Sequence, residues 1–207
     1  PNKTQTIENI KKISKILGKD HVYVRYDPIF LSDDYPVDYH IKAITRICEL
    51  LDGYIDKIII SFIDDYKNIR KNEAAIHFRP FSEADYQNLG TNISKVANAH
   101  NIRVHTCYEA RNLAEYGFDE EECLSHELAY MLTGHKYPNW KARKEHLCNC
   151  VNIVDIGTFN SCSHFCKYCY ANYKEESVRK NMRLHDVNSS LLLGHLTNED
   201  KITIRKK

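Results

Sequence analysis

Three closely spaced cysteines are the feature of this sequence best suited to chemistry. Cys162, Cys166 and Cys169 follow the spacing C-x3-C-x2-C in an otherwise polar stretch. Thiolates are soft ligands that bind zinc, copper(I) and iron–sulfur clusters. Structural zinc sites use pairs of cysteines and four ligands, whereas three cysteines can hold three corners of a [4Fe–4S] cluster and leave one iron open. The spacing favours such a cluster over idle thiols, which are usually buried singly.

The same spacing, with the aromatic Tyr168 directly before the last cysteine, resembles the signature of the radical S-adenosylmethionine (SAM) superfamily. The resemblance implies that the open iron chelates SAM, that an electron from the cluster cleaves its sulfonium bond, and that Tyr168 lies beside the adenine. Two features depart from that superfamily. The triplet follows the last predicted strand instead of the first, and the chain has no Gly-Gly pair to meet the SAM amino group. A carboxylate such as Glu109 or Asp64 would have to take that role.

A second group of thiols indicates a further metal site. It consists of Cys107, Cys123, Cys148 and Cys150. Four thiols suffice for an auxiliary iron–sulfur cluster or a structural zinc ion. Cys123 stands beside an apolar stripe, so a buried inert thiol is the alternative for that residue. Cys48 is alone on an apolar helix face and is predicted to belong to the core.

Apolar periodicity predicts alternating helices and strands. We expect helices over 5–17, 37–52, 82–99, 109–116 and 119–132, strands over 21–28, 56–62, 101–107 and 151–155, and a polar loop over 63–81. This alternation predicts an α/β fold with a parallel sheet. Four strands are too few for a closed barrel, so we expect part of a (β/α) TIM-barrel-like sheet whose N-terminal strands lie upstream. Residues 1–173, with the cysteine loop at 157–172, would form this domain, and 174–207 a polar tail that packs on it or is partly disordered.

Ionisable side chains follow the predicted strands at their carboxyl ends, where parallel α/β folds bind ligands. Arg25 and Asp27 close the first strand, Asp64 follows the second, and Glu109 follows the third. We interpret these four residues as candidate catalytic groups. The alternatives are a structural ion pair for Arg25 with Asp27, a solvated turn for Asp64, and a helix N-terminal charge for Glu109.

The composition argues against two classes of partner. The 29 basic and 28 acidic residues give a net charge of +1, so the chain offers no overall basic character for nucleic acid. No apolar run approaches the roughly 18–20 residues that span a bilayer. Clustered cysteines in a chain of this kind favour metal ligands over disulfides, and we expect a cytoplasmic protein.

Stretches along most of the chain resemble an uncharacterised bacterial and archaeal family of unknown function with a radical-SAM-like cysteine cluster at its C-terminal end. The matching stretches begin at Arg25, Ile60, Cys107, Cys148, Asp155, Cys169 and His185. The resemblance implies a [4Fe–4S] cluster, SAM, a reductant such as ferredoxin or flavodoxin, an unknown substrate, and hydrogen abstraction from it. The alternatives are a non-catalytic iron–sulfur electron-transfer protein, or a zinc-stabilised binding module that uses Cys148, Cys150, Cys166 and Cys169.

Overall fold

The computed structural model describes residues 2–65, 67–107, 109, 111–119, 122–143 and 150–204. Its contacts divide the chain into two compact units. The first unit comprises Pro1–Asp64 and His77–Ile153, and the second comprises Asp65–Ile76 and Val154–Lys207. Within the described residues, no helix is both long and apolar enough to cross a membrane.

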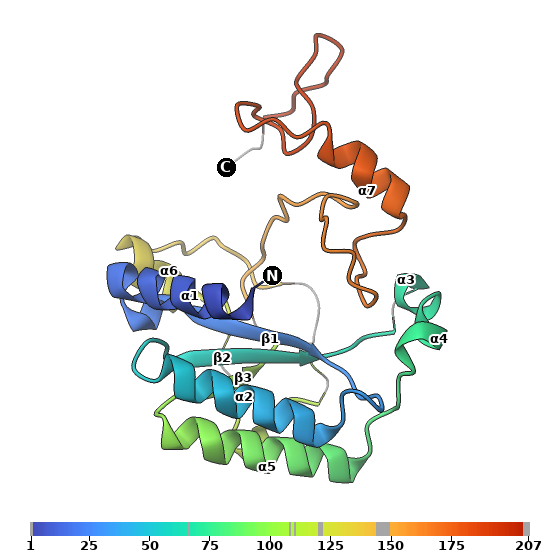
Figure 1. The fold of residues 1–207 in the computed structure, drawn as a ribbon. Helices are drawn as coiled ribbons and strands as arrows, with labels where there is room; N and C mark the ends of the chain where they lie inside the picture. The colour runs from blue at the N-terminus through green and yellow to red at the C-terminus, as the bar shows by residue number, and fades with distance from the viewer. Residues whose placement is uncertain are drawn as a thin grey trace. The chain divides into compact units, whose positions relative to one another are not determined.

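A parallel sheet of three strands forms the centre of the first unit (Figure 1). The strands are β1 (Tyr23–Ile29), β2 (Lys57–Phe62) and β3 (Arg103–Thr106), in the order β1-β2-β3. Ile59 on β2 lies opposite Arg25 on one side and His105 on the other. The predicted α/β class with a parallel sheet is confirmed. The sheet is open and small, and the described strands form no barrel.

Two helices cover one face of this sheet (Figure 1). They are α2 (Val37–Leu51) and α5 (Glu83–Ala99). Their buried residues recur at helical spacing. These residues pack on the face of the sheet to which Ile58 and its partners on the neighbouring strands point. Because side chains alternate along a strand, Ile59 and its partners on the neighbouring strands point to the opposite face. Arg25 and His105 therefore stand on the sheet face away from α2 and α5.

The first helix and a short 3-10 turn precede β1. Helix α1 (Lys3–Leu17) begins where the Asn2 side chain accepts a hydrogen bond from the Gln5 N–H. It ends at Gly18, whose φ of 95° few other residues adopt. The 3-10 helix η1 (Lys19–His21) then leads to the strand. All three long helices predicted from the sequence are present.

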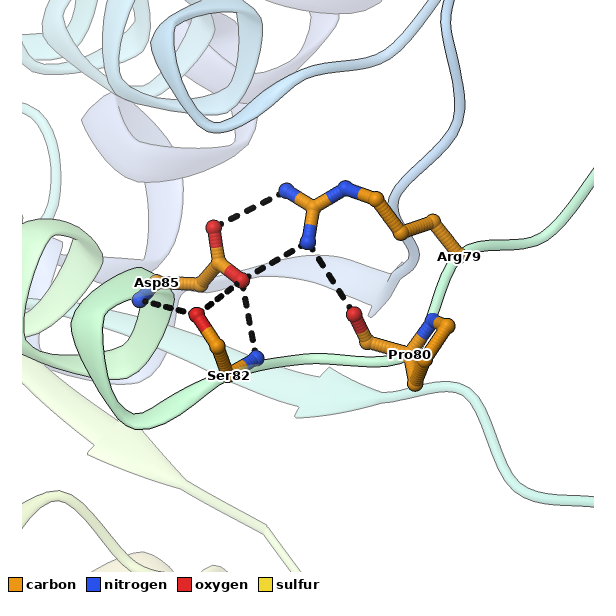
Figure 2. Close-up of polar contacts among 4 residues, drawn as sticks. All are labelled: Arg79, Pro80, Ser82 and Asp85. Carbon is orange, nitrogen blue, oxygen red and sulfur yellow. Dashed lines mark hydrogen bonds and ion pairs between the residues drawn. The ribbon is translucent and has the colours of Figure 1, made fainter.

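A polar network fixes the start of α5 (Figure 2). The Ser82 side chain accepts from the Asp85 N–H at 3.2 Å, and the Asp85 carboxylate accepts from the Ser82 N–H at 2.8 Å. Each side chain thus satisfies a backbone donor that the helix leaves free. Arg79 donates to both oxygens of the same carboxylate, at 2.7 and 2.9 Å. The predicted Ser82 cap is confirmed, with Arg79 as an added partner.

The structure corrects three predicted elements in the first unit. Residues 151–155 form no strand, because only Val151 makes an isolated bridge and Ile153 is 48% exposed. The helix predicted over 109–116 reduces to the 3-10 helix η2 (Ala114–Tyr116), and the one predicted over 119–132 is α6 (His126–Thr133). Helix α6 begins this late because the Ser125 side chain caps it at the Leu128 N–H. Its predicted end at Gly134 is confirmed.

The second unit contains short helices and turns. Helices α3 (Lys67–Arg70) and α4 (Glu73–Ile76) lie in the segment predicted as a polar loop over 63–81. Helix α7 (Glu175–Met182) opens the predicted tail. Beyond it, turns are held by local bonds such as that from the Gly194 N–H to the Leu184 carbonyl.

Candidate functional site

An ion pair stands at the carboxyl end of β1. The Arg25 Nε and Nη2 atoms lie 2.8 and 2.6 Å from Asp27 Oδ2. Residues two apart on a strand point to the same face, and the pairing expected from the sequence is confirmed. The Arg25 side chain is 46% exposed, which is more than its apolar neighbours in sequence suggested. Arg25 also hydrogen-bonds to the Cys107 thiol, and this bond and Asp27 raise its pKa against the opposing effect of burial.

Two thiols at the edge of β3 contact each other. Cys107 follows the strand directly, and its N–H donates to the Ile60 carbonyl, which fixes it beside the end of β2. Its side chain hydrogen-bonds to that of Cys123. This bond and the Arg25 guanidinium lower the pKa of Cys107 to about 6, although burial opposes the change. The bond to Cys107 and burial raise the pKa of Cys123.

The imidazole of His105 lies beside the pair of thiols formed by Cys107 and Cys123. His105 lies two residues before Cys107 on β3, and its side chain is buried. Its Nδ1 lies 3.1 Å from the Asp119 carbonyl, and its Nε2 lies 3.1 Å from Cys123 Sγ. A carbonyl can only accept, so Nδ1 carries the proton and Nε2 presents its lone pair toward the sulfur. The sequence had given His105 no role.

The next chain segment brings a third thiol to the same edge. The Val151 N–H donates to the Leu124 carbonyl at 3.0 Å, which places Cys150 beside Cys123. Cys150 is buried. The Arg143 N–H binds the Cys150 carbonyl and fixes this segment from its other side. Cys107, Cys123 and Cys150 thus lie on neighbouring segments of the first unit, whereas Cys148 lies outside the described residues.

Glu109 faces the end of β2. Its Oε1 accepts a hydrogen bond from the Phe62 N–H at 2.7 Å. Burial raises the pKa of Glu109 to about 7, and the negative charges of Asp64 and Cys107 add to this effect. The Phe62 bond opposes the shift. All four predicted catalytic groups therefore lie at the carboxyl ends of the strands, as the sequence indicated.

The cysteine triplet belongs to the second unit and occupies a closed loop. The Asn160 N–H donates to the Ala171 carbonyl, and the Asn160 side chain accepts from the Tyr173 N–H at 2.7 Å. The Asn172 amide donates to the Cys162 carbonyl at 2.8 Å. These bonds join the two ends of the loop, so all three cysteines lie between clamped ends. Cys162 and Cys166 are exposed and Cys169 is half-buried.

Neighbouring elements of the second unit hold this loop. Asn72, which follows α3, donates to the Lys167 carbonyl at 2.7 Å. The guanidinium of Arg179 on α7 stacks over the Phe165 ring at 5.3 Å. Tyr168 is half-buried within the loop. The loop is therefore fixed from both the 65–76 segment and α7, which the sequence did not predict.

None of the described cysteines forms a disulfide with another described residue. Cys48 is fully buried in the core, as predicted. Within the described residues, no group of three or more His, Cys, Asp or Glu side chains is arranged so that it could hold a metal ion. A metal at either thiol group would require the side chains to turn toward a common point.

A comparison with protein families identifies the family of this chain. The family model described as "Domain of unknown function (DUF1848)" covers residues 1–171, which include the sheet, the second thiol group and the triplet. No curated protein and no solved structure matches the chain.

Proposed function

We propose that this chain, which belongs to the DUF1848 family of unknown function, binds a [4Fe–4S] cluster through Cys162, Cys166 and Cys169 and acts on SAM in the manner of radical SAM enzymes. The observation that carries the proposal is the closed loop of the second unit, which presents three free thiols between clamped ends. A bound cluster would supply the electron for reductive cleavage of SAM, followed by hydrogen abstraction from a substrate.

The donor set of the loop fits such a cluster. Three thiols meet the demand for soft ligands, and three ligands leave one iron open. The side-chain oxygen of Asn172 is buried and has no hydrogen-bond partner in the described structure, while its nitrogen holds the Cys162 carbonyl. A buried acceptor without a donor is costly, which suggests that the loop is complete only with a further group bound.

The other residues have proposed roles within their own units. Tyr168, beside the last cysteine, would contact the adenine of SAM. Arg25, Asp27, Asp64 and Glu109 would bind the polar groups of a substrate at the strand ends of the first unit. Glu109, with a pKa of about 7, can either accept or donate a proton there.

The proposal also concerns the larger fold to which the three-stranded sheet belongs. Helices α2 and α5 cover one face of the sheet, and the opposite face carries Arg25 and His105. In a (β/α) barrel the helices lie outside and the other face lines the interior, so we propose that the sheet is part of such a barrel. Free thiols fit a reducing compartment, and we propose a cytoplasmic location with ferredoxin or flavodoxin as reductant.

The test is anaerobic reconstitution of the full chain with iron and sulfide. We expect about four irons and four sulfides for this cluster, and an EPR signal of the reduced protein that changes shape when SAM is added. Cys166→Ser should abolish the signal that responds to SAM. The matched control, Cys48→Ser, changes a thiol buried in the core of the first unit and should retain the cluster.

Three other outcomes would refute parts of the proposal. A cluster that ignores SAM would indicate electron transfer in place of catalysis. Zinc bound without iron would indicate a structural module. A cluster that survives Cys166→Ser unchanged would show that the triplet is not its ligand set.

A further inference from the structure

We propose that Cys107 and Cys123 form a dithiol–disulfide redox site in the first unit, which exchanges electrons with a low-molecular-weight disulfide. The side chains of the two cysteines hydrogen-bond to each other, and neither forms a disulfide with a described residue. Their sulfur atoms therefore already touch, and a disulfide requires them to approach to about 2 Å. The site is separate from the triplet, so the inference does not depend on the proposed cluster.

Backbone hydrogen bonds hold the two cysteines at one edge of the sheet. The Cys107 N–H donates to the Ile60 carbonyl at 2.9 Å, directly after β3. The segment that leads to Cys123 is bound to β3 where the Asp119 N–H donates to the Val104 carbonyl at 2.8 Å. Cys123 itself lies outside any helix or strand. One thiol is therefore fixed at a strand end, and the other stands in a segment whose backbone can adjust.

Both sulfur atoms have polar partners, unlike an inert thiol of the core. The Arg25 guanidinium hydrogen-bonds to Cys107, and His105 Nε2 lies 3.1 Å from Cys123 Sγ. Both cysteines are half-buried, so a small reagent can reach them, whereas Cys48 is fully buried in the hydrophobic core. Reactive cysteines stand in partly exposed surroundings near cations or imidazoles, whereas structural cysteines are buried and inert.

The partners give the two thiols different roles. The positive charge of Arg25 favours negative charge on Cys107, and the thiolate is the attacking species in disulfide exchange. His105 Nδ1 lies 3.1 Å from the Asp119 carbonyl, which can only accept, so in the neutral ring Nε2 can take the proton of Cys123. Cys107 is therefore the attacking thiol, Cys123 the thiol that completes the disulfide, and His105 its base.

The exchange proceeds in two steps. Cys107 Sγ attacks one sulfur of the small disulfide, whose S–S bond breaks, and the first small thiol leaves with the proton of Cys107. Cys123 Sγ then attacks Cys107 Sγ in this mixed disulfide and passes its proton to His105. The second small thiol leaves and takes that proton from the imidazole. Two protein thiols are oxidised to one disulfide, and one small disulfide is reduced to two thiols.

Oxidation changes the end of β3 and its surroundings. The new bond ties Cys107 to the segment that precedes α6, and Arg25 loses the thiol to which it hydrogen-bonds. The redox state of the pair is thereby coupled to the position of the Arg25 side chain. Disulfides in a reducing compartment are usually transient and act in catalysis or redox sensing, which suits a pair that is reduced in its resting form.

The test uses the full chain with Cys162→Ser/Cys166→Ser/Cys169→Ser as the background. These changes remove the other described thiols that are exposed or half-buried, so that reaction with the reagent reports the first unit. The folded protein is equilibrated without oxygen in mixtures of reduced and oxidised glutathione. Remaining thiols are then trapped with N-ethylmaleimide, and the protein is digested with trypsin.

The digest identifies the pairing directly. Cys107 and Cys123 are each the only cysteine of their tryptic peptides, residues 104–111 and 112–136, so their disulfide gives one cross-linked product. We expect this product to form in the folded protein. At a fixed concentration of oxidised glutathione, the ratio of disulfide to dithiol should fall with the square of the reduced glutathione concentration, as exchange of two thiols requires.

Three variants test the roles, and a fourth is the control. Cys107→Ser should abolish the cross-linked product, and Cys123→Ser should stop the reaction at the mixed disulfide, with one glutathione on Cys107. A general base typically contributes about 10²–10⁴-fold, so His105→Gln should slow the conversion of mixed disulfide to protein disulfide by at least about tenfold. Cys48→Ser changes a thiol of the core and should react as the background does. Far-UV circular dichroism checks that each variant folds.

Four results would overturn the inference. The first is the absence of the cross-linked product at every glutathione ratio. The second is a disulfide that joins Cys107 or Cys123 to Cys148 or Cys150 in place of the proposed pair. The third is a product that forms only in urea, which would show that the folded chain keeps the two sulfurs apart. The fourth is a glutathione adduct on Cys107 that persists although Cys123 is present.

Discussion

Asp85 offers the sharpest test of how the first unit is held together, because its carboxylate serves both the start of α5 and Arg79 (Figure 2). Asp85→Asn keeps the shape of the side chain and removes its charge. The ion pair is partly exposed, with 48% of the Arg79 side chain and 14% of the Asp85 side chain accessible, so its loss should cost about 1 kcal/mol. Asp85→Ala also removes the capping bonds and should cost about 2 kcal/mol.

These free energies correspond to measurable shifts in melting temperature. For a chain of this size, 1 kcal/mol lowers the Tm by about 2–4 °C, so we expect about 2–4 °C for Asp85→Asn and about 4–8 °C for Asp85→Ala. The fluorescence of Trp140, the only tryptophan, reports unfolding of the first unit. In an Arg79→Met background, Asp85→Asn should cost about 1 kcal/mol less.

The pH dependence of the stability gives an independent test of the contribution of Asp85. The hydrogen bond from Arg79, with those from Ser82, holds the pKa of Asp85 below its usual range. A carboxyl whose folded pKa is depressed stabilises the fold above the unfolded value of about 3.9, and this stabilisation is lost as the pH falls below it. The difference between wild type and Asp85→Asn should therefore be constant from pH 7 to 5 and shrink below about pH 4.

The control is Glu49→Gln on α2, which breaks a pair with Arg46 whose side chains are 47% and 66% exposed. It should change the stability by less than about 0.5 kcal/mol. Equal effects of Glu49→Gln and Asp85→Asn, or a difference that persists unchanged at pH 3, would refute the reasoning.

Three more predictions follow from single contacts. Burial lowers the pKa of His40, so the stability that the neutral imidazole contributes is present above about pH 6.5 and is lost as the pH falls. In urea unfolding between pH 7 and 5, the free energy of unfolding of His40→Gln should therefore fall less than that of wild type. Gly90→Ala places a Cβ in steric overlap with the Tyr116 side chain. This overlap should cost about 1–3 kcal/mol and outweigh the gain of about 0.5–1 kcal/mol in helix propensity, which calorimetry would measure as a lower stability. Asn160→Ala removes the clamp on the Tyr173 N–H, and the variant should retain less iron after reconstitution while its Trp140 unfolding transition stays unchanged.

Local patterns predicted the elements that depend on local signals. Apolar residues at helical spacing identified α1, α2 and α5, and the buried run Ile58–Ile60 identified β2. The run over 151–155 has the same local character, yet a strand exists only if another strand pairs with it, and Ile153 has no such partner in the described sheet. Partner choice depends on segments distant in sequence, so residue types alone could not exclude this strand.

The residues of the candidate site also divide into those that local patterns predict and those that depend on distant segments. Cys107, Arg25 and Asp27 were predicted because strand ends meet at one edge of a parallel sheet. His105 was missed, although its place two residues before Cys107 was a usable signal, since the two side chains share a face. The place of Cys150 in the segment beside Cys123 depends on the bond between Val151 and Leu124, which no local pattern encodes.

The strand order β1-β2-β3 repeats the order of the chain. Each strand can therefore pair with its predecessor as soon as it leaves the ribosome, and no strand has to be inserted between two that are already paired. His105 and Cys107 arrive with the last strand, and Cys123 and Cys150 follow still later. During synthesis the three described strands can therefore pair before the segments that carry Cys123 and Cys150 are made, so those segments would fold onto strands that are already paired.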